Sequence, residues 1–334
     1  MSTRTSPPVS EARFATLASC MLSLVALAGA PAHAQEETGN WRFSDDSKPV
    51  KVFVLGGSVA AYPAGSFSQW LGGVCSNIEV VNRAKAKLGA FELRQRFIAQ
   101  VVKNRRLDDE TRKKTWLVFL GGLNSVGSPE TTNIEVSKTL KLAKDAGLMT
   151  LGVTINPWGA EDDRRWEGVD GIAYFEHSQR TVDFMMGRLT PTQAFGEAHV
   201  KGMADATHFQ SGELPDVAVD LWNGSLRHLD APRRDVVKLT RNAKRSDWLK
   251  KRLATLPEAE RPGRLDKLIT QASELPRWFM KPEYVGFDHI HPNAAGHREI
   301  AQAICEKAPA AWGCTCGELP KLTWDRRGQK PKAL

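Results

Sequence analysis

The sequence predicts an α/β fold in which helices cover both faces of a central parallel sheet. Four short apolar runs in the first half of the chain alternate with stretches of helical periodicity about 15 residues long. Two of these runs end in glycine pairs, Gly56-Gly57 and Gly121-Gly122, which are typical of loops that leave a strand. Strands joined through helices of this length pair in parallel, because a parallel pair needs a crossover connection.

The expected elements alternate along the chain. Apolar runs predict buried strands, and apolar residues at helical spacing predict amphipathic helices. One helix ends at Gly147, a favourable C-cap residue, and the last begins just after Pro292. The expected strands are 50–55, 78–81, 116–120, 148–155 and 216–221, and the expected helices are 66–74, 89–103, 130–146, 178–189, 241–254, 261–275 and 293–307.

These elements indicate one α/β domain over residues 50–310 and not two domains. A polar, loose lead-in precedes it at 35–49. A long insertion occupies about 156–214, between the fourth and fifth strands, and a C-terminal tail of little periodicity follows at 311–334. A chain of 334 residues has ample material for a buried core.

The N-terminus predicts export. Two arginines precede an apolar stretch over 14–30, and Ala32-His33-Ala34 then offers small residues at the spacing of a cleavage site. Residues 1–34 are therefore expected to be a signal peptide that leads to the periplasm or the exterior, and no integral membrane span is expected. Lipoprotein processing at Cys20 is the alternative, but there the apolar run follows the cysteine instead of preceding it.

Export changes the interpretation of the cysteines. Four remain once Cys20 has left, and an even number in an oxidising compartment favours two disulfides that tie the tail to the domain. Cys314 and Cys316 are too close in sequence to join each other, so two pairings stay open. Cys-x-Cys with two distant cysteines matches no common zinc spacing, so no metal site is expected. The disulfide candidates are Cys75, Cys305, Cys314 and Cys316.

Composition and charge exclude several classes of protein. With 41% hydrophobic and 25% charged residues, the chain is neither disordered nor a polytopic membrane protein. The net charge is +8, and most of the excess lies in 233–264 and 321–332. No basic run is interleaved with aromatic residues, so no nucleic-acid partner is expected. The basic excess is either a solvated face or a site of weak association with an anionic envelope surface.

Three short segments at strand ends or helix starts offer the parts of an acyl-transfer site. Gly56-Gly57-Ser58 supplies a hydroxyl, Gly122-Leu123-Asn124-Ser125 an amide, and Asp288-His289-Ile290-His291-Pro292 a carboxylate with imidazoles. In open parallel sheets, ligands bind beyond the carboxyl ends of the strands, where such loops lie. Acyl transfer requires a nucleophile, an oxyanion donor, a base and an orienting acid, and these segments supply one of each.

With these segments the chain resembles the SGNH/GDSL hydrolase superfamily of esterases and lipases. The Gly-Asp-Ser block of that family corresponds to 56–58, and its Gly-x-Asn-Asp block to 122–125. Its Asp-x-x-His-Pro block with a following Gly-His corresponds to 288–292, Gly296 and His297. The resemblance implies a flavodoxin-like three-layer αβα sandwich and a reaction that needs no cofactor and no metal.

The resemblance also implies roles for single residues. Ser58 would be the nucleophile, His291 the base and Asp288 its orienting carboxylate. Asn124 and the Ser58 N–H would hold the oxyanion. His289 is a rival base, but only His291 has the Asp-x-x-His spacing that lets the carboxylate reach Nδ1 and fix the tautomer of the ring.

The chain departs from the family pattern at several positions. Gly57 replaces the aspartate of the first block, and Ser125 replaces that of the third. The second block, Asn-x-Gly-x-x-Gly, begins at Asn82, but Lys87 stands where its glycine donor is expected, and the next glycine, Gly89, is the candidate donor. One missing oxyanion donor costs about 2.7–4 kcal/mol of transition-state stabilisation, so an inactive protein is a real alternative.

The insertion carries the expected specificity residues. Trp158 and Trp166 could stack on a sugar ring and are the predicted substrate-binding residues. Alternatively they form, with Tyr174 and Phe175, the small core of the insertion. The charged cluster 161–165 is either a solvated surface or a polar substrate contact.

The sequence thus predicts an exported serine esterase that forms an acyl-enzyme on Ser58. Its expected substrate is a small-molecule or polysaccharide ester, with acetyl esters on a polysaccharide favoured. The alternative is a catalytically inactive SGNH-like domain that binds envelope glycan or a partner protein. A lysophospholipase or thioesterase is a third interpretation.

Overall fold

A computed structural model describes residues 39–317, except Ala64, Gly202, Ala204 and Lys244, together with the short strands at 322–323 and 332–333. The predicted signal peptide, 1–34, lies outside these residues. Within the described part of the chain, no helix is long and apolar enough to cross a membrane.

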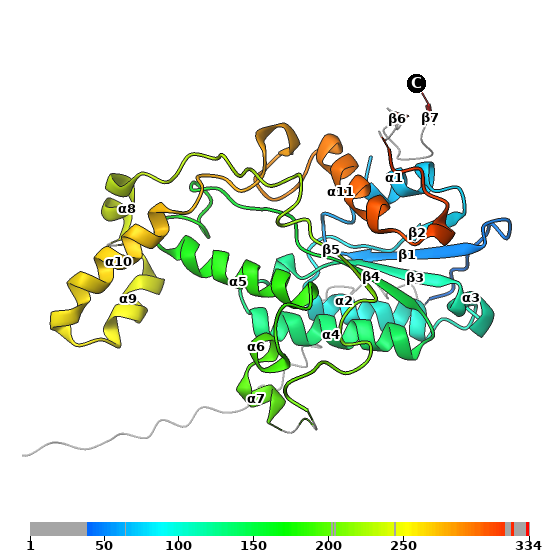
Figure 1. The fold of residues 1–334 in the computed structure, drawn as a ribbon, viewed down its shortest axis with the longest axis horizontal. Coiled ribbons are helices and arrows are strands. Elements are labelled where there is room, and N and C mark those ends of the chain that lie inside the picture. Colours follow the sequence, from blue (N-terminus) through cyan, green and yellow to red (C-terminus); the bar gives the residue numbers. More distant parts are fainter. Residues whose placement is uncertain are drawn as a thin grey trace, which may run out of the picture. The chain divides into compact units, whose positions relative to one another are not determined.

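The central sheet has five parallel strands in the order β2-β1-β3-β4-β5 (Figure 1). This is the flavodoxin-like order, and it confirms the predicted fold class. The order reverses at β1, so the carboxyl ends of β1 and β3 flank the crevice where ligands bind in such sheets. The strands are β1 (Val50–Gly56), β2 (Ile78–Asn82), β3 (Thr115–Leu120), β4 (Met149–Val153) and β5 (Val217–Val219).

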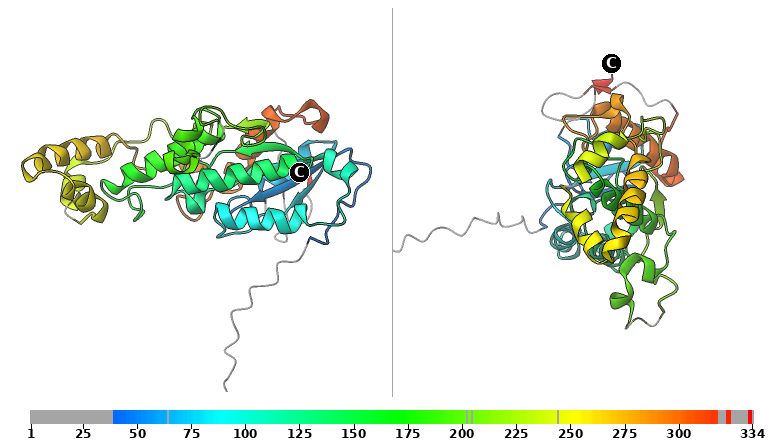
Figure 2. Two further views of the ribbon diagram at one scale, coloured as in Figure 1. Left: turned by 90° about the horizontal axis from the view of Figure 1, so that it is seen from below. Right: turned by 90° about the vertical axis from the view of Figure 1, so that its left-hand side faces the viewer.

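Helices cover both faces of the sheet (Figures 1 and 2). Along β1, Val52 and Val54 pack with the apolar side chains of α1 and α11, whereas Phe53 and Leu55 pack with those of α2, α4 and α5. This alternation follows from the two-residue period of a strand. The helices of the two layers are α1 (Phe67–Val74), α11 (Ala294–Lys307), α2 (Ala90–Phe97), α4 (Pro129–Asp145) and α5 (Asp170–Met185).

The described part of the lead-in, residues 39–49, is not loose, contrary to the prediction. Trp41 and Phe43 are both buried, and the Trp41 ring stacks on Phe53 of β1 at a centroid distance of 5.2 Å. The Trp41 indole also donates a hydrogen bond of 2.8 Å to the Gln100 carbonyl. Two aromatic side chains in a polar stretch therefore anchor it to the core.

The long connection expected after the fourth strand is present between β4 and β5. It contains α5, α6 (Pro191–Phe195) and α7 (Glu197–Val200). The predicted start of its main helix, at residue 178, is wrong, because α5 begins at Asp170. Glycines at 168 and 171 are typical of a loop, but Gly171 lies in the first turn of α5. A Cβ at Gly171 would lie 2.5 Å from the guanidinium of the buried Arg234, so the glycine makes room for that side chain.

A second long connection, between β5 and α11, carries three helices that we call the helical arm: α8 (Val236–Ala243), α9 (Asp247–Ala254) and α10 (Arg261–Ser273). The single helix predicted over 241–254 is divided, because the Ser246 hydroxyl caps α9 by accepting the Leu249 N–H. The arm has a small apolar core of its own, which includes Leu239, Leu268 and Ile172 of α5. The remaining helix, α3, spans Asp109–Lys113.

Two disulfides join the C-terminal segment to the sandwich. Cys75, which follows α1, bonds to Cys314, and Cys305 of α11 bonds to Cys316. Of the two pairings that the sequence left open, the structure contains this one. Cys75, Cys305 and Cys314 lie within 4.8 Å of one another, but their sulfurs are already used in these bonds.

Candidate active site

Ser58 lies in the turn that directly follows β1. The turn passes very close to β3, since a Cβ on Gly56 would lie 2.2 Å from the Leu120 carbonyl oxygen, and only glycine fits there. Asn82, at the end of β2, donates its amide to the Ala60 carbonyl at 2.8 Å. Neighbouring strand ends therefore fix the backbone that carries the Ser58 hydroxyl.

A hydrogen-bonded chain connects Ser58 to Asp288 through His291. The Ser58 hydroxyl lies 2.7 Å from His291 Nε2, and His291 Nδ1 lies 2.9 Å from one Asp288 carboxylate oxygen and 3.0 Å from the other. A carboxylate only accepts hydrogen bonds, so Nδ1 carries the ring proton and Nε2 is free to accept the serine proton. This arrangement is able to activate a serine for nucleophilic attack.

Asp288 is held in its charged form. Partial burial by itself would raise the pKa of this carboxyl, but the backbone N–H groups of His291 and Ile290 and the His291 ring together lower it below its ordinary value. Both N–H groups donate to the same carboxylate oxygen at 2.8 Å. The carboxylate thus shapes its own loop as well as orienting the imidazole.

The insertion supports the loop that contains His291. The Gly159 N–H donates to the His289 carbonyl at 2.7 Å, and the Asn156 amide donates to the Ile290 carbonyl at 3.0 Å. Asn156 is fully buried. His289 is part of this backbone contact, and its ring makes no hydrogen bond to the described residues at Nδ1, so it is His291 that faces Ser58.

The predicted oxyanion donors are engaged in other hydrogen bonds. The Asn124 amide donates to the Leu88 carbonyl at 3.0 Å, although it lies beside the nucleophile turn, 3.2 Å from where a Gly57 Cβ would be. The Gly89 N–H donates to the Glu92 carboxylate at 3.1 Å, which is the glutamate half of a capping box at the start of α2. Within the described part of the chain, no residue accepts a hydrogen bond from the Ser58 N–H.

Lys87 is the only described non-glycine residue with a positive φ, of 69°. It stands at the position where the family pattern has a glycine, so this backbone adopts the conformation that glycine would favour. Ser125, which replaces the aspartate of the third block, accepts the Ala90 N–H at 3.1 Å. At these two departures, Lys87 therefore adopts a glycine-like backbone conformation and the Ser125 hydroxyl satisfies a backbone N–H at the start of α2.

Two aromatic contacts around His291 were not foreseen from the sequence. The Phe287 ring is 79% exposed and stacks on the His291 ring at a centroid distance of 4.7 Å. Below the site, His297 is completely buried against Tyr62, and burial lowers its pKa to about 3, with a smaller contribution from His291. The exposed position of Phe287 could not be predicted, because nothing in the neighbouring sequence distinguishes an exposed ring from a buried one.

Trp158 and Trp166 do not line the site. Both are fully buried, and their rings pack edge to face at a centroid distance of 5.0 Å. The Trp158 indole donates to the Ser178 hydroxyl at 3.0 Å. Neither ring can reach a substrate, so the prediction of sugar stacking is wrong for both and the alternative, a core for the insertion, is what the structure contains.

The known proteins that the chain is similar to are solved structures. No family model and no curated protein sequence matches the chain. A GDSL-like lipase from Bacteroides thetaiotaomicron is similar with a TM-score of 0.44 and 12% identity, over 81% of this chain and 92% of that one.

Two further solved structures are similar to a comparable degree. A member of the lipolytic protein G-D-S-L family from Veillonella parvula gives a TM-score of 0.41 at 12% identity, over 77% and 97%. A catalytic mutant of an acetylxylan esterase from Geobacillus stearothermophilus gives 0.38 at 12%, over 78% and 94%. At this identity the similarity concerns the fold.

Proposed function

We propose that the protein is a serine esterase in which Ser58 forms a covalent acyl-enzyme. The observation that carries this proposal is the unbroken chain of hydrogen bonds from Ser58 through His291 to Asp288, with distances of 2.7 and 2.9 Å. The three side chains come from two segments, one with Ser58 and one with Asp288 and His291, that are more than 200 residues apart in sequence. Such a chain at a strand end of a flavodoxin-like sheet has the geometry that nucleophilic catalysis requires.

In the proposed reaction, His291 Nε2 takes the Ser58 proton while Oγ attacks the ester carbonyl carbon. The Ser58 N–H and the Asn124 amide hold the oxyanion, once Asn124 has turned from the Leu88 carbonyl. The protonated His291 then gives its proton to the leaving alkoxide, and the C–O bond of the ester breaks. Water, deprotonated by His291, attacks the acyl-enzyme and releases the acid with Ser58 restored.

Acetyl esters on a polysaccharide of the cell envelope or its surroundings are the proposed substrates. Two disulfides are typical of proteins in oxidising compartments, which supports export. The inactive, binding-only alternative is favoured by one observation, the engagement of Asn124 and Gly89 in hydrogen bonds within the protein. The test must therefore detect an activated serine and not only a fold.

The experiment is intact-protein mass spectrometry after incubation with a fluorophosphonate. We expect one adduct on the native protein and none on Ser58→Ala or His291→Ala. Ser225→Ala is the matched control, because Ser225 is exposed and outside the site, and it should be labelled like the native protein. A well-folded native protein that stays unlabelled would contradict the proposal and favour the inactive alternative.

A further inference from the structure

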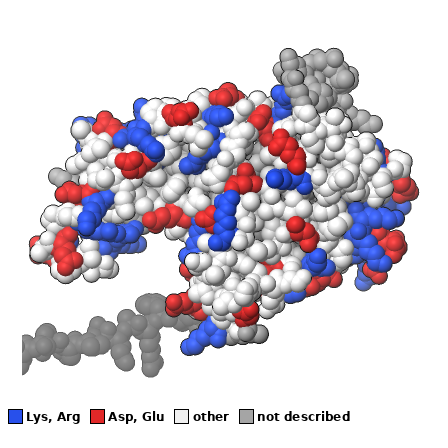
Figure 3. Space-filling model, viewed as in Figure 1, with Lys and Arg blue, Asp and Glu red and all other residues white. Residues whose placement is uncertain are grey.

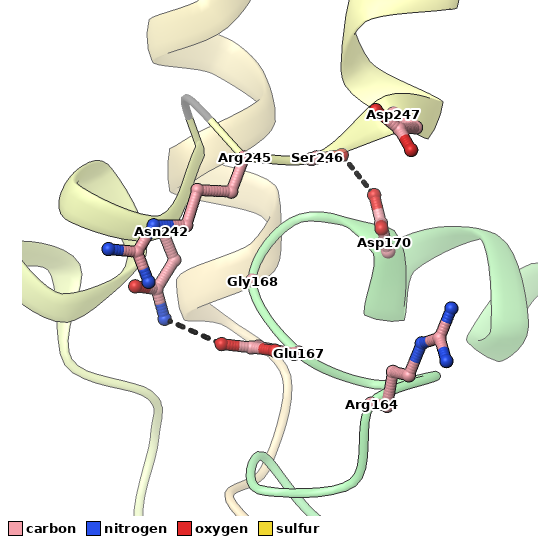
Figure 4. A pocket seen from close by; sticks show the side chains of 8 residues that line it. All are labelled: Arg164, Glu167, Gly168, Asp170, Asn242, Arg245, Ser246 and Asp247. Atoms are coloured by element: carbon pink, nitrogen blue, oxygen red, sulfur yellow. Dashed lines mark hydrogen bonds between the residues drawn. The ribbon is translucent and has the colours of Figure 1, made fainter.

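A groove with polar walls lies between the start of α5 and the helical arm. One part, of about 720 Å³, is lined by Asp163, Arg164, Arg165, Asp170 and Tyr174. The next part, of about 320 Å³, reaches the junction of α8 and α9 (Figure 4). The two parts share Arg164 and Asp170 in their walls and so lie next to each other; we call them together the polar groove.

The near end of the polar groove adjoins the loop that carries His291. The Asp163 N–H donates to the Ala160 carbonyl at 3.0 Å, and the preceding residue, Gly159, is hydrogen-bonded to the His289 carbonyl. The Arg165 guanidinium lies 4.9 Å from the centroid of the buried Trp158 ring. Its pKa is raised, chiefly because it donates hydrogen bonds to the Asp163 carboxylate and to a lesser degree by the charge of Asp288. The near end of the polar groove is therefore connected, through the hydrogen bond of Gly159 to the His289 carbonyl, to the loop that carries His291.

The walls of the polar groove suit a ligand with many hydroxyl groups. Around the far part, two hydrogen bonds join the walls: Asn242 donates to Glu167 at 3.2 Å, and Ser246 is hydrogen-bonded to Asp170. Figure 4 shows Asn242 and Ser246 on the wall formed by the arm, and Glu167 and Asp170 on the opposite wall. None of the residues that line this far part has an aliphatic or aromatic side chain. A fatty acyl chain needs apolar walls, whereas sugar hydroxyls bind to alternating donors and acceptors. Tyr174 adds one aromatic ring to the wall of the near part.

The arm at the far end is strongly basic. Residues 233–267 contain twelve Lys and Arg against five Asp and Glu, which is nearly the whole net charge of the chain. Among the described residues, the exposed Arg241, Arg245, Lys251 and Lys267 form no ion pair. Figure 3 shows Lys and Arg side chains interspersed with Asp and Glu side chains over the face of the arm that it draws. A ligand that extends from the groove onto the arm gains most if it is anionic.

We propose, on the basis of the esterase function proposed above, that the polar groove and the arm bind an anionic polysaccharide. The sugar unit that bears the ester lies at Ser58, and neighbouring units follow the groove past Tyr174 and Arg164 to Arg245. The protein is then a deacylase of an acidic glycan polymer, and the arm keeps the polymer bound between successive reactions.

Binding is tested separately from catalysis, in the full exported chain with the Ser58→Ala substitution. The probe is partially O-acetylated alginate, a uronate polymer, in affinity gel electrophoresis at low and high salt. We expect retardation that weakens as salt rises, because charge contacts are screened. Adding Arg245→Ala and Asn242→Ala should weaken retardation at least five-fold. Arg105→Ala is the matched control, because Arg105 precedes β3 at the opposite end of the sheet, and it should leave retardation unchanged.

Each outcome decides between specific possibilities. Retardation by neutral O-acetylated xylan as strong as by alginate would overturn the anionic part of the proposal. Absence of retardation by alginate, or retention by anionic phospholipid vesicles alone, would overturn the whole. A native protein that the fluorophosphonate labels but alginate does not retard refutes only the groove. A protein that alginate retards but that stays unlabelled refutes only the esterase.

Discussion

The two sides of Ser58 are organised differently. On the base side, His291 is already hydrogen-bonded to both Ser58 and Asp288, and contacts from the insertion hold the loop that carries them. On the oxyanion side, the Asn124 amide and the Gly89 N–H each donate to an acceptor within the protein. In the proposed reaction the base side is thus prepared without substrate, whereas on the oxyanion side Asn124 and Gly89 must first exchange a hydrogen-bond partner.

The two sides correspond to two tasks that any serine hydrolase must perform. Activation of the nucleophile depends on a local motif, Asp-x-x-His, and on a single long-range contact to Ser58. Stabilisation of the oxyanion depends on donors from several loops, and each donor is worth energy only if it is free to turn toward the developing charge. We therefore expect substitutions on the base side to have the larger effects.

The largest effect is expected for Asp288→Asn. The amide can donate to Nδ1 and so favours the wrong tautomer of His291, in which Nε2 carries the proton and cannot accept one from Ser58. We expect a loss of about 10⁴-fold in kcat on a small aryl ester, with the fold intact by circular dichroism. A loss below ten-fold would mean that Asp288 does not orient the base.

Asn124→Ala should have the next largest effect. If the amide turns to the oxyanion in the transition state, its loss costs about 10²–10³-fold in kcat with little change in KM. Steady-state kinetics of the same aryl ester measures both constants. An unchanged kcat would place Asn124 in a purely structural role, at the Leu88 carbonyl.

A pH-dependent effect is expected from His297, below the base side. Burial lowers its pKa from 6.5 to about 3, so between these values the unfolded chain binds a proton that the folded chain does not. The free energy of unfolding therefore falls as the pH drops below about 6.5, by roughly 2 kcal/mol at pH 5 for this one group. His297→Phe should remove that part of the decline.

Urea denaturation of both proteins at pH 7.5 and pH 5 checks this expectation. The comparison uses the change with pH within each protein, so a general loss of stability in the variant does not affect it. An equal decline in both proteins would show that His297 titrates normally in the folded state.

Glu92→Ala tests the Gly89 donor on the oxyanion side. Removing the carboxylate breaks the capping box of α2 and should lower the free energy of unfolding by about 1 kcal/mol. It also frees the Gly89 N–H, so kcat should rise several-fold if that group reaches the oxyanion. A stability loss with no gain in kcat would exclude Gly89 as a donor.

The smallest effect is expected for Lys87→Gly. A lysine in the left-handed region is strained by about 1 kcal/mol, part of which is offset because glycine is more flexible in the unfolded chain. We expect the variant to be more stable by somewhat less than 1 kcal/mol in urea denaturation. Lys85→Gly, at a neighbouring exposed residue with ordinary φ, should be neutral or destabilising.

The fold was predictable because its signals are local and strong. Each of the first four predicted strands is a short apolar run beside a glycine or asparagine, and the helix at Pro129–Asp145 has clear periodicity and a glycine after its end. The juxtaposition of Ser58 with Asp288 and His291 was also predictable, because strand ends and helix starts meet at one edge of a parallel sheet. The catalytic roles of these residues stay a prediction.

The remaining features depend on tertiary packing. A tryptophan at 158 has the same local pattern whether its ring faces a sugar or the core, and only the fold around it determines that it is buried. The hydrogen bond from Asn124 to Leu88 joins two loops, and the distance between these loops in space cannot be predicted from the sequence. The start of α5 was missed because its glycine makes room for Arg234, a residue from a distant connection.

The disulfide between Cys75 and Cys314 can form only late in the synthesis of the chain. The first helix and strands are synthesised, and can begin to pack, long before the cysteine that secures them emerges, since 239 residues separate the two. During that interval Cys75 is a free thiol that can pair with a wrong cysteine. Maturation is therefore completed only when the segment that contains Cys314 and Cys316 arrives, and the oxidant must act late.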